Sequence, residues 1–425
     1  MATQDEATAR PPAGMATGGF AKAMGGGTAA LILVQAGWIF AGMDYTIYSS
    51  ALPLILADLN ISITTAGIIF FLSLQGTWIG SLLIPVIADY VGRRRVMMGN
   101  ILLYSLTTGA VAFAATNWYL TLARFLVNFA VGAEQPVGAT YISERWNPKT
   151  RARAMGFMQS GFAIGLLLAS ILLATVGATY GWRILFVIGA LPALLLVGFR
   201  FWLPESEKWV EIRDQKRAGT LDPAQSGFTL AQLFTPGLRR ATLIGTILLL
   251  AGNTAGGGIL AWAPTFLKVA RNLDISSVGW FGVVLALGLL FGYNMAGVLA
   301  DWTSRRVSLM VAFALGIVSL IAFGIVTNLT LLAIAIFLVG AGLGGQFGNF
   351  IVYLSELFPT AVRATGVGWC MGIGLVAWSI VPLLLGFLAP TGDFGTLFAI
   401  LGGGACLIGI IAAYFGPETK GKALA

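Results

Sequence analysis

The chain has 425 residues, of which 57% are hydrophobic and only 10% are charged, and its mean hydropathy is +0.87. A soluble domain averages about 25% charged residues, so this composition excludes an ordinary water-soluble protein and predicts an integral membrane protein. The net charge of +8 does not indicate nucleic-acid binding, because most Lys and Arg residues lie in short segments between long apolar runs. The absence of His excludes a His-based catalytic or metal site. We expect no enzyme activity and no cofactor.

The long apolar runs predict twelve transmembrane spans, since a spanning helix needs about 20 apolar residues. The predicted spans cover residues 29–52, 63–88, 96–115, 118–140, 154–178, 183–203, 241–267, 277–300, 307–327, 330–353, 364–388 and 394–415. Most Lys and Arg residues lie before the first span, after the last span or in alternate loops. The positive-inside rule therefore predicts that both chain ends are cytoplasmic. We expect a multi-pass protein of the plasma membrane, which in a bacterium is the inner membrane.

The predicted spans divide the chain into five segments. Residues 1–28 are rich in Ala, Gly and Thr and have no apolar core, which predicts a flexible cytoplasmic tail rather than a signal peptide. Residues 29–203 and 241–415 each form a predicted six-helix bundle. Between them, residues 204–240 carry mixed charges and predict a cytoplasmic linker. Residues 416–425 form a second predicted cytoplasmic tail.

Two motifs of the first bundle recur in the second bundle at one offset of 212 residues. Tyr141 to Glu144 recurs as Tyr353 to Glu356, and a second pair of copies includes Asp89 and Asp301. The repeated charged residues include Asp89, Arg93, Arg94, Glu144 and Arg151, and their counterparts Asp301, Arg305, Glu356 and Arg363. Both halves begin on the same side of the membrane, so they are parallel structural repeats of a transporter.

The repeated motifs resemble those of the major facilitator superfamily from about residue 29 to 421. Residues 88–94 and 297–306 look like the loop motif of that family. Residues 204–206 and 417–421 are similar to motifs of its sugar-porter branch. The resemblance implies an all-α membrane protein with twelve transmembrane helices in two parallel six-helix bundles.

The repeated charges predict a cytoplasmic gate. An acid at a helix end can accept hydrogen bonds from a helix N-terminus and pair with arginines. We expect these pairs to form when the cytoplasmic ends of the bundles meet, to stabilise the outward-open state, and to break when the cytoplasmic side opens. The alternative is that these residues only fix topology and cap helices.

Three ionisable residues lie well inside predicted spans: Asp44, Glu134 and Arg124. A charge at the bilayer centre costs about 2.5–3.5 kcal/mol on insertion scales, so such residues are functional candidates. Burial disfavours the charged form of a carboxyl, and a proton-coupling site requires an acid that binds and releases a proton. The alternative is a buried structural ion pair, for example between Arg124 and Asp44.

The segments around these charges narrow the resemblance. Residues 42–44, 132–134 and 141–146 look like those of proton-coupled organic-acid symporters, most closely the sialate and aromatic-acid type. That resemblance implies that Asp44 and Glu134 carry the proton and that Arg124 helps to hold an organic anion.

Other side chains within the spans are candidates for substrate contacts. Tyr48 lies four residues after Asp44 and shares its helical face. The remaining candidates are Tyr45, Gln159, Asn253, Trp262, Tyr293, Asn294, Gln346, Asn349 and Trp369. For the aromatic residues, packing and interfacial anchoring are the alternative.

These features together predict a monomeric proton symporter that imports a small organic anion by alternating access, with protons and the lipid bilayer as its other partners. Within transport, the alternative is a proton-coupled exporter or a transporter of a neutral sugar-like substrate. An intramembrane aspartyl protease would need two aspartates that share a proton, whereas the second acid here is Glu134. A transporter-like receptor without flux is a further alternative.

Overall fold

A computed structural model describes residues 27–146, 151–200, 233–358 and 363–420, together with residues 210 and 214. These residues form helices and short connections, with no strand among them, so the predicted all-α class is confirmed. The predicted tail at 1–28 and the predicted linker at 204–240 lie largely outside the described residues.

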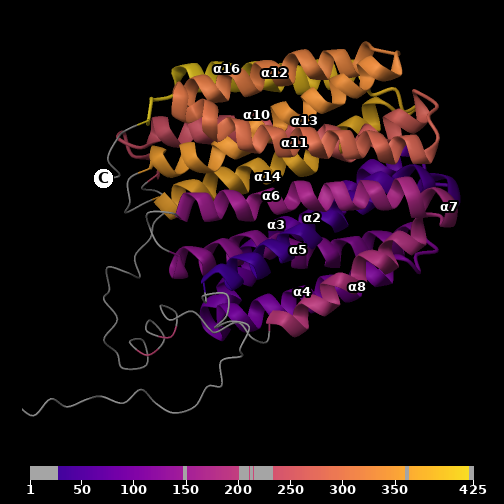
Figure 1. Ribbon diagram of the computed structural model, residues 1–425, viewed down its shortest axis with the longest axis horizontal. Helices are drawn as coiled ribbons and strands as arrows, with labels where there is room; N and C mark the ends of the chain where they lie inside the picture. The colour runs from indigo at the N-terminus through magenta and orange to yellow at the C-terminus, as the bar shows by residue number, and fades with distance from the viewer. Residues whose placement is uncertain are drawn as a thin grey trace, which may run out of the picture.

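The first half of the chain forms six helical rods that run side by side (Figure 1). They are α2 (Gly27–Asp58), α3 (Ile63–Val91), α4 (Arg93–Val111), α5 (Asn117–Arg145), α6 (Arg151–Leu172) with the π-helical turn η1 (Leu173–Gly177) and α7 (Ala178–Tyr180), and α8 (Trp182–Arg200). Hydroxyl side chains begin two of these helices, because Ser62 accepts from the Thr65 N–H and Thr116 from the Tyr119 N–H.

The second half repeats this arrangement and lies above the first in Figure 1. Its rods are α10 (Arg239–Val269), α11 (Ile275–Trp302), α12 (Arg305–Ile325), α13 (Leu329–Leu357), α14 (Arg363–Leu388), and a last rod made of α15 (Gly395–Leu397), η4 (Phe398–Gly403) and α16 (Gly404–Phe415). We name the end of the molecule where α8 ends and α10 begins the linker end. The end that carries α7 is the opposite end (Figure 1).

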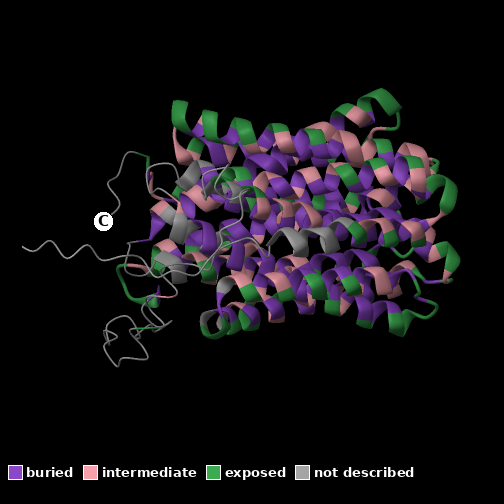
Figure 2. Ribbon diagram, turned by 60° about the horizontal axis from the view of Figure 1, so that its bottom comes forward, coloured by how far each residue is buried: buried purple, intermediate pink, exposed green. Residues whose placement is uncertain are grey.

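The outer surface of the rods is apolar, as a lipid environment requires. Nine stretches of the described residues are long and apolar enough to cross a membrane on their own. The other three rods, α4, α5 and α8, run alongside them, and α5 carries Arg124 and Glu134 inside the bundle. Large apolar side chains such as Leu82, Phe113 and Ile325 are exposed on the outside, whereas buried residues line the interior (Figure 2). The twelve predicted spans are thus present as helices.

Close backbone contacts within each half are duplicated at the 212-residue offset. A Cβ atom on Gly80 of α3 would lie 1.8 Å from the Phe129 carbonyl oxygen of α5. A Cβ atom on Gly292, the counterpart in α11, would lie 2.2 Å from the Ala341 carbonyl oxygen of α13. Only glycine permits this spacing, so the same residue type fixes the same helix pair in both halves.

The two halves meet near the opposite end through another duplicated contact. The Thr64 hydroxyl of α3 donates to the Gly386 carbonyl of α14 at 3.1 Å, and a Cβ atom on Gly386 would lie 3.0 Å from the Gly67 Cα. The counterpart of Gly67 is Gly279 of α11, where a Cβ atom would lie 2.5 Å from the Ala174 nitrogen of η1. Small residues therefore bring the two halves into backbone contact at this end.

Candidate functional site

A buried ion pair lies inside the first half, between α2 and α5. Arg124 Nη1 lies 2.8 Å from Asp44 Oδ2, and the two side chains are only 1% and 5% exposed. Removing one member of such a pair leaves an uncompensated buried charge, which is strongly unfavourable. The structure thus brings together Asp44 and Arg124, two of the three predicted intramembrane charges. This is the buried ion pair that the sequence gave as the alternative interpretation.

Two neighbouring side chains complete the surroundings of the pair. The Thr108 hydroxyl of α4 donates to Asp44 Oδ1 at 2.7 Å. The Arg124 guanidinium lies over the Tyr48 ring, 4.5 Å from its centroid, which is a cation–π contact and confirms that Tyr48 shares the face of Asp44. Arg124 Nε is buried and has no hydrogen-bond partner among the described residues, so the guanidinium retains a donor for a further acceptor.

Aromatic rings connect the ion pair to the second half. The Phe70 ring lies 4.9 Å from Tyr48 and 5.7 Å from Trp262 of α10. The Tyr45 ring lies 5.8 Å from Trp378 of α14. The Trp262 indole also donates to the Pro382 carbonyl at 3.0 Å, so its only polar group is engaged in α14. These rings therefore form apolar contacts from the surroundings of the pair to α10 and α14.

Glu134 forms a second buried acidic site on the linker side of the pair. It lies ten residues after Arg124 on α5, which corresponds to about 15 Å along a helix. Its side chain is 3% exposed. The Asn100 amide of α4 donates to Glu134 Oε2 at 3.4 Å and to the Ala130 carbonyl at 2.7 Å. Both buried carboxylates therefore accept a hydrogen bond from α4.

The structure does not bring most other predicted substrate contacts to the ion pair. Gln159 of α6 accepts from the Gln135 amide at 3.1 Å. In the second half, Asn349 donates to the Ser308 hydroxyl of α12, and Gln346 lies 3.5 Å from the Ala312 carbonyl. Four more candidates have local neighbours: Asn253 donates to the Leu249 carbonyl, Asn294 to the Leu290 carbonyl, Trp369 packs on Phe234, and Tyr293 of α11 lies beside Gly348.

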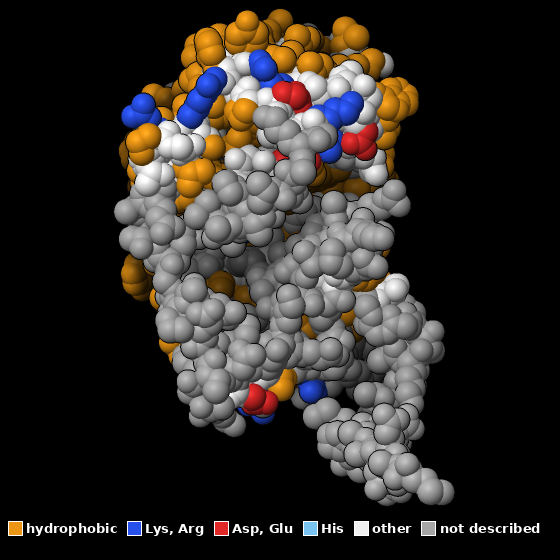
Figure 3. All heavy atoms as spheres, turned by 90° about the vertical axis from the view of Figure 1, so that its left-hand side faces the viewer, with side chains coloured by type: hydrophobic (Ala, Val, Ile, Leu, Met, Phe, Trp, Pro, Cys, Tyr) orange, Lys and Arg blue, Asp and Glu red, His pale blue; other side chains and the backbone are white. Residues whose placement is uncertain are grey.

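The predicted gate residues of the second half form a charged cluster at the linker end. Arg305 pairs with Asp301 at 2.8 Å and with Glu356 at 3.3 Å. Figure 3 shows charged side chains gathered over the second half at this end. All three residues belong to the same half, so these pairs do not require the two bundles to meet. The expectation that such pairs form only when the bundles meet also concerns Arg363, whose side chain the structure does not describe, so it stays a prediction.

The C-terminal segment completes this cluster. The Thr419 hydroxyl donates to Glu356 at 2.6 Å, and Glu418 accepts from the backbone N–H groups of Arg305 and Arg306. Burial alone would raise the pKa of Glu418, but hydrogen bonds from the Lys420 backbone, the Ser304 hydroxyl and the start of α12 hold it below its ordinary value.

The gate prediction for the first half falls mostly outside the described side chains. Arg94 is half-buried. The side chains of Asp89, Arg93, Glu144 and Arg151, and that of Arg363 in the second half, are not among those that the structure describes. The duplicated cluster is therefore visible in the second half, and its first-half counterpart stays a prediction.

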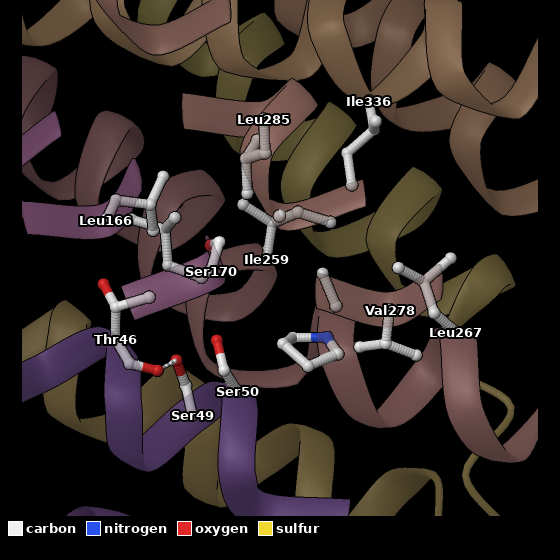
Figure 4. Close-up of a pocket in the computed structure, with 14 residues that line it drawn as sticks. Thr46, Ser49, Ser50, Leu166, Ser170, Ile259, Leu267, Val278, Leu285 and Ile336 are labelled. Atoms are coloured by element: carbon white, nitrogen blue, oxygen red, sulfur yellow. Dashed lines mark hydrogen bonds between the residues drawn. The ribbon is translucent and has the colours of Figure 1, made fainter. Parts of the chain in front are cut away.

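A small cavity lies between the two halves near the opposite end (Figure 4). Thr46, Ser50 and Ser170 line it from the first half, across from aliphatic side chains that include Ile259, Val278 and Leu285 of the second half. Its volume is about 20 Å³, which is room for one water molecule. An organic anion does not fit there, so the halves are closed around this point.

Three comparisons with known proteins agree with this architecture. A family model described as Major Facilitator Superfamily matches residues 36–369 and, in an overlapping match, 270–425. A cis,cis-muconate transport protein of Acinetobacter baylyi is 28% identical over 387 residues, which cover 89% of this chain and 92% of that protein. A sialic acid transporter of Escherichia coli is 27% identical over 369 residues, which cover 85% and 87%. The solved structure of a D-xylose-proton symporter matches this chain with a TM-score of 0.76 and a sequence identity of 20%. The match covers 93% of this chain and 99% of that chain, which shows that the two share a fold.

Thr108 and Asn100, the two α4 residues that contact the buried carboxylates, were not predicted from the sequence. The available signal was their spacing, because Asn100, Tyr104 and Thr108 recur every four residues in an apolar span and so share one helical face. Neither residue type is costly enough in a membrane helix to mark a site on its own.

Proposed function

Because this chain belongs to the major facilitator superfamily, we propose that it is a secondary active transporter that couples the movement of a small organic anion to that of a proton. The observation that carries this proposal is the buried Asp44–Arg124 pair with its unused Arg124 Nε donor. The names of the relatives support a carboxylate substrate, since cis,cis-muconate and sialic acid are both organic acids.

The ion pair provides a physical reason for coupling. Protonation of Asp44 removes the negative charge that balances Arg124. A buried arginine without a counter-ion is strongly unfavourable, and an incoming carboxylate supplies that counter-ion through a charge-assisted, bidentate contact. Proton and anion therefore stabilise the occupied site together, and either one alone leaves a charge unbalanced. This is the energetic requirement of symport.

The two ends of the molecule support alternating access. The positive-inside rule assigns the linker end to the cytoplasm. The halves meet at the opposite end, where Thr64 and Gly67 contact Gly386 and where Gly279 contacts Ala174. In this orientation the structure is closed to the outside. Glu134 lies between the ion pair and the linker end, so we assign it to the passage of the proton toward the cytoplasm.

Reconstitution into proteoliposomes tests this function. Radiolabelled cis,cis-muconate and sialic acid serve as the first probes, with and without an inward proton gradient, and a neutral sugar tests the alternative substrate class. We expect Asp44→Asn to abolish gradient-driven accumulation but to retain exchange of substrate across the membrane. Arg124→Ala removes both activities, because the anion loses its counter-ion.

The matched control for Asp44 is Asp58→Asn. Asp58 also lies on α2 and pairs with an arginine, but it is about 44% exposed at the opposite end, so we expect its substitution to leave accumulation intact. Full concentrative uptake by Asp44→Asn removes Asp44 from the coupling role. Uptake that is indifferent to collapse of the proton gradient contradicts symport.

A further inference from the structure

The small cavity between the two halves is polar on one side and apolar on the other. Its polar side consists of four hydroxyl side chains of the first half, which are Thr46, Ser49, Ser50 and Ser170 (Figure 4). Each of them is at most 4% exposed. The side chains that the second half contributes to the lining are all apolar. Burying a hydroxyl group without a hydrogen-bond partner is unfavourable, so these groups require partners.

Three of the four hydroxyl groups have no hydrogen-bond partner among the described residues. The Ser49 hydroxyl donates to the Thr46 carbonyl at 3.2 Å, which is the dashed contact in Figure 4. The Thr46 Oγ1 is buried and unpartnered, and no hydrogen bond joins the Ser50 or Ser170 hydroxyl to a described residue. All three residues line the same cavity, so a small ligand there would meet several hydroxyl groups at once.

Two prolines add backbone acceptors at the same place. Pro53 lies inside α2 and Pro264 lies inside α10. A proline has no N–H group, so the carbonyl four residues before it loses its helical donor. These carbonyls belong to Ser49 and Leu260, and both residues line the cavity, as does Pro264 itself. The Leu260 carbonyl therefore gives the otherwise apolar side of the cavity a hydrogen-bond acceptor, of the kind that ordered water satisfies in membrane helices.

We propose that the cavity binds one water molecule, which joins the hydroxyl groups of the first half to the Leu260 carbonyl of the second half. Its volume of about 20 Å³ suits one water, which needs room of at least about 10–15 Å³ and two to four polar partners. Hydroxyl groups can donate or accept, so they can bind a water that also donates to the carbonyl. We name Thr46, Ser50, Ser170 and the Leu260 carbonyl the bridging-water site.

The chemistry of the lining favours water over a cation. No acidic residue is among the described residues that line the cavity, so a monovalent cation there would be buried against neutral oxygens only. Burial of an uncompensated charge is far more costly than burial of a neutral polar group. The ligand of this site is therefore neutral and able to both donate and accept.

The bridging-water site is complete only while the halves are together. Ser170 lies on α6, and a Cβ atom on Gly282 of α11 would lie 2.5 Å from its Oγ, so the second half packs directly against this residue. Separation of the halves would take the Leu260 carbonyl away from the hydroxyl groups and expose both to bulk water. Because a water-mediated contact is nearly as favourable as a direct one, the bound water stabilises the closed arrangement. The proposal takes from the proposed function only that the opposite end opens, and it does not depend on the ion pair.

The direction of the effect of one substitution tests the proposal. Thr46→Val keeps the shape of the side chain and removes its hydroxyl. If nothing satisfied this hydroxyl in the closed protein, its removal would favour the closed form, since an unsatisfied buried group carries its full desolvation cost. With a bound water, the water loses a partner instead, and we expect the ratio of closed to open protein to fall about fivefold. Spin-label distances across the opposite end of the full-length protein in lipid measure this ratio.

Two further variants are the controls for this measurement. Thr46→Ser keeps the hydroxyl and should retain the wild-type ratio. Thr175 lies at the same end, is exposed, and donates to the Ile171 carbonyl at 2.8 Å, so Thr175→Val should leave the ratio unchanged. A ratio that is unchanged or higher in Thr46→Val overturns the proposal. A wild-type ratio that changes when sodium is replaced by potassium also overturns it, because the cavity would then hold a cation.

X-ray radiolysis detects the water directly, because hydroxyl radicals formed from a bound water oxidise the side chains beside it. We expect Ile259 and Leu285, which line the cavity, to be oxidised in the wild type and to lose most of this oxidation in Thr46→Val. Leu248 of α10 is similarly buried but does not line the cavity, so it should stay unmodified. Unmodified Ile259 and Leu285 in the wild type contradict a bound water. Their oxidation in a protein without proton-driven transport would support the bound water and remove the proposed function.

Discussion

The two halves of this protein share their backbone packing but not their interior chemistry. Gly80 and Gly292 bring equivalent helices into the same close contact. By contrast, the positions 212 residues after Asp44, Arg124 and Glu134 are occupied by Gly256, Ile336 and Gln346. Duplication has preserved the features that hold helices together. The buried charges of the described residues are concentrated in one half.

This difference separates two kinds of constraint. A glycine at a helix crossing has no substitute, because any Cβ atom would overlap a backbone carbonyl. A buried charge is costly in lipid and is therefore a candidate for a functional role. Under the proposed function, one proton and anion site is sufficient for two halves that rock against each other, so the second half can provide an apolar and neutral polar wall. Four predictions, each with its own substitutions, test this division.

The largest effect should come from breaking the ion pair in the first half. Arg124→Met leaves Asp44 buried without its cation and should lower the free energy of unfolding by about 3–5 kcal/mol at neutral pH. Its counterpart Ile336→Met is a volume-conserving change in an equally buried position and should cost less than about 1.5 kcal/mol. Denaturant unfolding in micelles measures both. Equal losses would mean that the first half holds no special electrostatic site.

The glycine contacts should respond equally in the two halves. Gly80→Ala and Gly292→Ala each place a methyl group against a backbone carbonyl, and overpacking of this kind costs about 1–3 kcal/mol or more. Gly99→Ala is the control, because a Cβ atom there meets no atom within 4 Å and alanine favours the helix. The melting temperatures of the three variants measure the loss of stability at each glycine. A tolerated change in only one half would show that the packing is not equivalent.

The fold was predictable from the sequence because hydropathy, charge distribution and the duplicated motifs each respond to a simple physical constraint. The thickness of the membrane determines the length of each span, and the 212-residue offset identifies the two repeated halves. The site was only partly predictable. Asp44 and Arg124 could be identified because charged residues are rare in lipid. By contrast, the sequence of a helix that is apolar on all sides does not predict which of its faces points to the interior. Gln346 and Asn349 were predicted to contact the substrate, and in the structure their amide nitrogens donate to Ala312 and Ser308 of α12.

A smaller, local effect is expected where the C-terminal segment holds the start of α12. The pKa of Glu418 is below its ordinary value of 4.5, so the hydrogen bonds of its carboxylate stabilise the segment fully above that pH and are lost as the pH falls through the lowered pKa. Glu418→Gln should mimic the acid form at neutral pH. Faster hydrogen exchange at residues 304–307 would report the loss. An unchanged exchange rate there would mean that the carboxylate does not hold the segment.

The smallest effect concerns the paired contacts between the halves at the opposite end. Gly67 with Gly386 and Gly279 with Ala174 are counterparts, but within the described residues only the first contact has a hydroxyl that bonds across it, Thr64 to Gly386. Thr64→Val removes a neutral hydrogen bond worth about 1 kcal/mol, so the population closed at this end should fall by about fivefold relative to the open one. Spin-label distances across the two halves measure that ratio. Ser276→Ala, at the counterpart of Thr64, should leave it unchanged, and an equal response of both variants would show that the two contacts close the protein symmetrically.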